Sequence, residues 1–181
     1  MVKKIKPINS LNISLERDVF MRHLIRELAG TLEDVVGYEE ASGYISLVGQ
    51  NMGEFINDMY KKELGISTLT RSHVADVLVD LKTRIEGSFA LIEQDDNKII
   101  LESTSCPFED EVLNRPSMCM MTSNVFGFIA AENLGYAKVV IGQSIAESHD
   151  KCKVIVYLKL TPEAESAVGR EYYRTIEDNV D

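Results

Sequence analysis

Three cysteines, Cys106, Cys119 and Cys152, are the residues whose chemistry stands out in this chain. Twelve residues separate the first from the second, and the third follows 33 positions after the second. This spacing is too wide for a zinc-finger pattern, in which the ligands come in close pairs. Free cysteines are most often small buried hydrophobic residues, so spacing alone favours packing over metal binding.

A metal site would need these thiols to converge in the fold. His149 stands three residues before Cys152 and could add a nitrogen ligand, which would complete a set of three cysteines and one histidine. Three thiolates near one point repel each other, and a bound cation is the natural way to neutralise them. Zinc and an iron–sulfur cluster with one non-cysteine ligand are both chemically reasonable.

Other catalytic patterns are missing from the sequence. There is no glycine-rich phosphate loop, no Gly-x-Ser-x-Gly elbow and no evident acid–base pair, so we expect a protein that is not an enzyme. His23 and His73 lie in predicted amphipathic helices and are interpreted as residues without a catalytic role.

Composition narrows the class of protein further. The 181 residues are 45% apolar and 27% charged, as in an ordinary globular domain, and the formal net charge is −10. An acidic chain is a poor candidate for nucleic-acid binding. The sequence contains no run of about 18 apolar residues, the length that a membrane-spanning helix needs. An odd number of cysteines without a signal peptide favours reduced thiols and a cytoplasmic protein.

The pattern of apolar residues and breakers predicts helices first and strands afterwards. We expect residues 1–13 to be a flexible lead-in, residues 14–160 to form one domain and residues 161–181 to form an acidic tail. The first expected helix covers 15–29 and ends at Gly30, and a later one, 71–85, begins after a Thr70 cap. The other expected helices cover 41–64 and 118–134. The expected strands cover 88–93, 98–103, 136–141 and 152–160. This order predicts an α+β fold: N-terminal helices packed on an antiparallel sheet of about four strands, interrupted by one helix.

The predicted helix over 41–64 has the clearest apolar periodicity. Gly49 and Gly53 lie on one face of it, where they would let another backbone come close. The bulky residues Met52, Phe55, Ile56 and Phe126 are expected to face the sheet, where they would either line a ligand pocket or simply fill the core.

The second half of the chain resembles the methanogen output domain, a branch of the 4-vinyl reductase-like domains. The resemblance rests on Cys-Pro-Phe at 106–108, on the segments 116–127, 129–131, 135–139 and 152–158, and on the helix over 45–53. It covers most of residues 15–160. It implies the ligand-binding fold of the TRAPP small subunits and of haem–NO sensors, with helices on one face of an antiparallel sheet and dimers formed through the helices.

The resemblance also bears on the cysteines. Related phenol sensors bind zinc through a Cys, a Glu-x-x-Cys and a last Cys. Here Cys119 and Cys152 match the first and the last, but residues 142–145 hold neither the Glu nor the middle Cys. The zinc site is therefore not preserved as such, and Cys106 would have to replace the lost ligands.

Members of this family are mostly sensory or output modules of prokaryotic signalling proteins. We therefore expect a homodimeric, non-enzymatic sensor or output domain that binds a small, apolar molecule and acts through a separate signalling partner. One alternative is a protein-interaction adaptor without a ligand. Another is a reductase of a vinyl-bearing or aromatic substrate.

Overall fold

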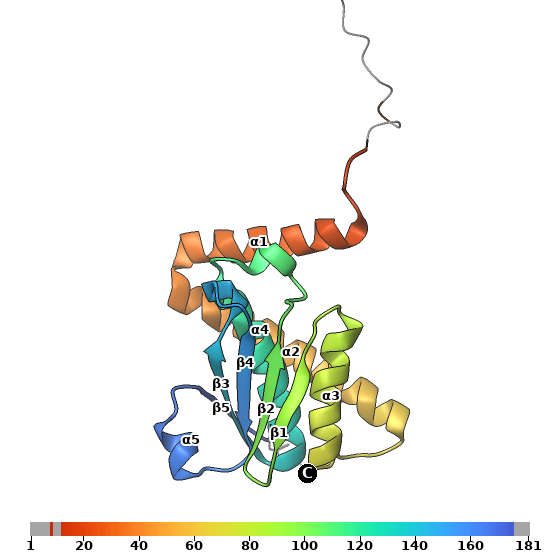
Figure 1. Ribbon diagram of the computed structural model, residues 1–181, viewed down its shortest axis with the longest axis vertical. Coiled ribbons are helices and arrows are strands. Elements are labelled where there is room, and N and C mark those ends of the chain that lie inside the picture. Colours follow the sequence, from red (N-terminus) through yellow and green to blue (C-terminus); the bar gives the residue numbers. More distant parts are fainter. Residues whose placement is uncertain (1–7, 9–11, 176–181) are drawn as a thin grey trace, which may run out of the picture.

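A computed structural model describes residue 8 and residues 12–175 of the chain (Figure 1). The expected lead-in therefore lies mostly outside the described residues, and so do the last residues of the expected tail. The main helices are α1 (Arg17–Val36), α2 (Tyr38–Leu64), α3 (Arg71–Arg84) and α4 (Cys119–Leu134), with a short α5 (Pro162–Ser166). The described residues also form the short turns η2 (Glu109–Val112), η3 (Pro116–Met118) and η4 (Ile145–Glu147).

The strands form one antiparallel sheet with the order β1-β2-β4-β3-β5. They are β1 (Ala90–Gln94), β2 (Lys98–Ser103), β3 (Tyr136–Gln143), β4 (Cys152–Tyr157) and β5 (Arg170–Tyr173). The α+β class and the antiparallel sheet are confirmed. The fifth strand was not predicted: β5 pairs with β3, so the sheet continues past residue 160 into the segment that was expected to be a tail.

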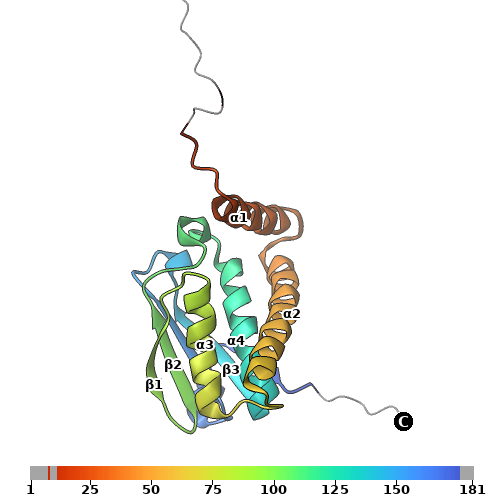
Figure 2. The ribbon, with the colours of Figure 1, turned by 90° about the vertical axis from the view of Figure 1, so that its right-hand side faces the viewer.

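The helices lie on one face of this sheet in two further layers (Figure 2). The helices α3 and α4 pack directly on the strands, α2 covers α4 from outside, and α1 lies across one end. Phe126 and Ile129 of α4 are completely buried, as are Leu78 of α3 and Val156 of β4. A helix enclosed between a sheet and another helix needs apolar residues around most of its circumference, and α4 has them.

The two glycines of α2 allow this close packing. A Cβ added at Gly49 would lie 2.8 Å from the Cβ of Asn124, and one added at Gly53 would lie 2.9 Å from the Cβ of Phe128. The predicted close approach of a backbone is confirmed. The backbone belongs to α4 of the same chain, so the glycine pair does not mark a contact between two copies.

The first predicted helix boundary was wrong. The helix α1 continues through Gly30 to Val36, and Gly37, with φ of 84°, separates it from α2. Gly30 is buried inside α1, where the Arg115 guanidinium packs over it and leaves no room for a side chain. Glycine here serves packing rather than helix termination. The Thr70 cap of α3 is confirmed, because the N–H of His73 donates to its hydroxyl at 3.3 Å.

Candidate ligand-binding site

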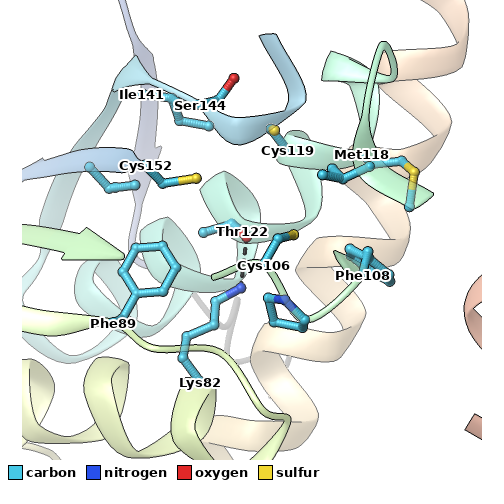
Figure 3. A pocket seen from close by; sticks show the side chains of 13 residues that line it. Lys82, Phe89, Cys106, Phe108, Met118, Cys119, Thr122, Ile141, Ser144 and Cys152 are labelled. Atoms are coloured by element: carbon cyan, nitrogen blue, oxygen red, sulfur yellow. Dashed lines mark hydrogen bonds between the residues drawn. The ribbon is translucent and has the colours of Figure 1, made fainter. Parts of the chain in front are cut away.

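The three cysteines line one small cavity (Figure 3). It lies at the end of the sheet where β2 ends and β4 begins. Its volume is about 30 Å³. All three thiols are free and partly buried. The remaining lining is mostly apolar and is contributed by Phe89, Pro107, Phe108, Val112, Met118, Ile141 and Val154, together with Lys82, Thr122 and Ser144.

Sheet register explains why cysteines so far apart in sequence meet here. Cys152 opens β4 and pairs with Ser103, the last residue of β2, so Cys106 follows β2 at the same end of the sheet. Cys119 is the first residue of α4 and projects from the helix end above these strands. The backbone N–H of Ile145 donates to the Cys152 sulfur at 3.4 Å and holds that thiol beside η4.

A buried lysine faces the thiols. Lys82, in the last turn of α3, is only 6% exposed, and its Nζ donates to the Thr122 hydroxyl at 2.7 Å. The same Nζ lies 5.5 Å from the ring centre of Phe89 and 5.4 Å from that of Phe126, within the range of cation–π attraction. Lys82 was missed in the sequence, although it follows Leu78 by four residues and so falls on the apolar face of its helix.

The charges at this site follow from its burial. Desolvation lowers the pKa of Lys82 to about 8, and the three neighbouring thiols oppose this fall in part. Burial also raises the pKa of Cys106 and, with the other two thiols beside it, that of Cys119 to about 12. Cys106 and Cys119 are therefore both uncharged thiols at neutral pH. Among the described residues, no carboxylate forms an ion pair with Lys82.

The predicted metal ligands do not all meet. His149 is exposed, does not line the cavity and bonds through Nδ1 to the backbone oxygen of Ser144 at 3.1 Å. Among the described residues, no group of three or more His, Cys, Asp or Glu side chains is arranged to hold a metal ion. The ammonium of Lys82 already places a positive charge among the thiols, which would repel a second cation. The residues as arranged thus do not fit zinc or an iron–sulfur cluster, and the metal content of the protein tests this interpretation.

The predicted pocket residues take other positions. Met52 and Phe55 were expected to face the sheet, but they are 40% and 60% exposed because α2 is the outermost layer and turns its glycine face toward α4. Ile56 is half-buried against the core and Phe126 is fully buried within it. None of the four lines the cavity, although Phe126 lies next to it through its contact with Lys82.

The segment of residues 106–118, here called the roof segment, is held against α1. Arg22 pairs with Glu109, and Arg26 with Glu111 at 3.4 Å. Arg26 also donates to the backbone oxygen of Leu113 at 3.0 Å. The roof segment contributes five of the thirteen residues that line the cavity. A change in its position therefore changes both the cavity and the seat of α1.

Two solved structures share the fold of this chain. The fold resembles that of the phenol-responsive sensory domain of the transcription activator PoxR, solved with phenol: TM-score 0.63, 15% identity, 84% of this chain and 80% of that one covered. It also resembles trafficking protein particle complex subunit 3 from Naegleria fowleri, covalently bound to palmitic acid: TM-score 0.55, 12% identity, 86% and 99% covered. No curated protein matches the chain.

Within the part of the chain that the structure describes, no helix has the length and apolar character needed to cross a bilayer.

The model of methanogen output domain 1 matches residues 24–157, which is most of the chain and includes α2 to α4, four of the five strands and all three cysteines. The chain therefore belongs to the methanogen output domain 1 family.

Proposed function

We propose that this protein is a non-enzymatic signalling output domain that senses a small molecule in the cysteine-lined cavity. The observation that carries the proposal is the cavity itself, a space with mostly apolar walls that also contains a buried cation and three thiols. Ligand sites typically combine apolar walls with a few converging polar groups. The likeness to a sensory domain with phenol bound supports the same class of function.

The size of the cavity suggests how binding would be signalled. About 30 Å³ holds one or two water molecules, so a larger ligand must displace part of the wall. The roof segment is the longest stretch of the wall that lies outside the strands and long helices, and its acidic residues pair with Arg22 and Arg26 of α1. A ligand that binds only when the roof segment moves would shift the protein toward a state with α1 released.

The exposed face of α2 provides a surface for the readout. Tyr44, Val48, Met52, Phe55 and Met59 recur at intervals of three and four residues and are each 40–60% exposed. We infer that a second copy of the chain covers this stripe, as expected for a homodimer, and that a signalling partner responds to the change at α1. The free thiols fit a reducing compartment, which supports the cytoplasm as the location.

The same apolar stripe favours a second function, that of a protein-interaction adaptor without a ligand. The two functions differ in what the cavity does: an adaptor would use the α2 stripe and leave the cavity without a binding partner. A test that blocks the cavity and spares α2 separates them.

The test uses Val154→Phe, which fills the cavity, and Ile155→Phe, which adds the same ring on the opposite face of the same strand. Phenol and toluene serve as probes in thermal shift and ligand-observed NMR titrations of the full chain. We expect both probes to bind the unmodified protein and Ile155→Phe but not Val154→Phe. Met118→Ala, which enlarges the cavity, should bind both probes more tightly. Failure of both probes to bind any of these proteins would refute the sensory proposal and favour the adaptor.

A further inference from the structure

We propose that the cavity selects ligands with an anionic oxygen group, above all a carboxylate, which docks on Lys82 and Thr122 while the rest of the ligand lies against apolar walls. This inference rests on the proposed function and names the chemical class of its ligand. It follows from the electrostatics of one buried cation without a charged partner.

The first step concerns the charge of Lys82. An ammonium removed from water is strongly disfavoured unless an opposite charge or several hydrogen bonds replace its hydration. Lys82 has one hydrogen-bond acceptor, the Thr122 hydroxyl, and no ion-pair partner among the described carboxylates. Cys106 and Cys119 remain protonated because burial raises the pKa of both thiols. An anion from outside would supply the missing counter-charge.

The second step concerns the direction of the free donors. An ammonium has three hydrogens, and Thr122 accepts one of them. Figure 3 shows the Lys82 nitrogen pointing toward Thr122 and the sulfur atoms. Because Lys82 is buried and lines the cavity, its remaining hydrogens face the cavity. The Thr122 hydroxyl accepts from Lys82 and keeps its own hydrogen free. An ammonium and a hydroxyl side by side can each donate to one oxygen of a carboxylate.

The third step concerns the field from α4. Cys119 and Thr122, both near the start of this 16-residue helix, line the cavity. The turn η3 leads directly into α4 and its backbone oxygens accept the N–H of Cys119, so the helix contributes its dipole here and not a free N–H. The positive end of the helix dipole therefore adds to the positive charge of Lys82. Ser144 also lines the cavity, but its hydroxyl donates to Glu147 at 2.8 Å and so does not oppose this positive field. The cavity is thus hostile to cations and favourable to anions.

The apolar walls limit what the anion can be. Phe89, Phe108 and Met118 face the same space and would cover a short hydrocarbon chain or a ring. An inorganic anion would leave these walls without a partner, whereas a small aromatic or aliphatic acid satisfies both the charge and the apolar surface. Benzoate, with benzamide and benzyl alcohol as uncharged relatives of similar shape, is therefore the appropriate probe set.

The test measures dissociation constants of the three probes for the full chain at pH 7 and pH 9. We expect benzoate to bind roughly tenfold to a hundredfold more tightly than benzamide at pH 7, as a hydrogen bond to a charged group implies. Lys82→Met should abolish this preference, so that benzoate binds no more tightly than benzamide. Lys138→Met, which removes another buried lysine that is paired with Glu171 and lies outside the cavity, should keep it.

Raising the pH gives an independent readout. The groups that face Lys82 are the thiols of Cys106, Cys119 and Cys152, with Glu147 of η4 behind Cys119. Since the pKa of Lys82 is about 8, the ammonium is mostly present at pH 7 and largely lost at pH 9. The affinity for benzoate should fall roughly tenfold between these pH values, and that for benzyl alcohol should not.

Each outcome decides the matter. If benzoate and benzamide bind equally well, the anion inference is wrong and the sensory function stands. If no probe binds, both are wrong. If a thiolate absorbs near 240 nm at pH 7, disappears in Lys82→Met and accompanies equal binding of the probes, the counter-charge is a cysteine of the protein itself, and the inference is overturned.

Discussion

Replacing Lys82 by methionine should stabilise the protein at neutral pH and lose this advantage in alkali. The fall of the Lys82 pKa from 10.5 to about 8 corresponds to about 3 kcal/mol in favour of the neutral amine in the folded state. Methionine has a similar length and no charge, so Lys82→Met removes this penalty. It also leaves the Thr122 hydroxyl without its donor, at a cost of about 1–2 kcal/mol. The net gain expected at pH 7 is about 1–2 kcal/mol in the free energy of unfolding.

The pH dependence has a definite sign. Because the folded-state pKa of Lys82 lies below its unfolded value, the unfolded chain binds more protons between about pH 8 and 10.5. The penalty is therefore complete below pH 8 and is relieved as the pH rises through this window. Between pH 7 and pH 10, the free energy of unfolding of the unmodified protein should rise by about 2.5 kcal/mol relative to that of the variant. The variant is therefore the less stable of the two at pH 10.

Urea unfolding of both proteins, reduced and in matched buffers at each pH, measures this difference. Both proteins carry the same three cysteines, so their contribution largely cancels in the comparison. Thr122→Val serves as the control that removes the hydrogen bond and keeps the charge; it should destabilise the protein at pH 7 by about 1–3 kcal/mol. A stability difference between Lys82→Met and the unmodified protein that stays constant from pH 7 to pH 10 would refute a buried ammonium at this site.

Three further predictions concern the surface, the roof segment and the metal. Phe55→Glu places a charge in the middle of the α2 stripe and should convert a dimer into a monomer, measured by light scattering coupled to size exclusion, with an unchanged circular dichroism spectrum. Arg26→Ala releases the roof segment from α1 and should lower the free energy of unfolding by about 1–2 kcal/mol; it should also tighten phenol binding, since the closed state that excludes the probe is weakened. Anaerobically purified protein should contain zinc and iron well below one equivalent per chain, because Lys82 lies where a cation would bind; one equivalent of either metal would require the thiols to rearrange around it.

The sequence by itself determined the class of fold and most of its elements. The strong apolar period of α2, the Thr70 cap of α3 and the polar residues 95–97 between β1 and β2 are local signals, and the structure contains each of these elements. The helix end predicted at Gly30 was wrong because a glycine that ends a helix and a glycine that makes room for Arg115 look alike in sequence. The strand β5 is short and lies in an acidic segment, so only its pairing with β3 identifies it.

Only the tertiary structure decided the site. The cysteines drew attention by their type, but whether they meet depends on the register of β2 with β4 and on the start of α4 above them, which no local pattern encodes. The outward turn of Met52 and Phe55 depends likewise on which face of α2 the glycines give to α4. The burial of Lys82 could be recognised only in the structure. A lysine on an apolar helix face usually extends its charge to solvent, but here the sheet, α4 and the roof segment close around it. Burial is a property of what surrounds a residue, and the surroundings of this cavity come from parts of the chain that lie far apart in the sequence.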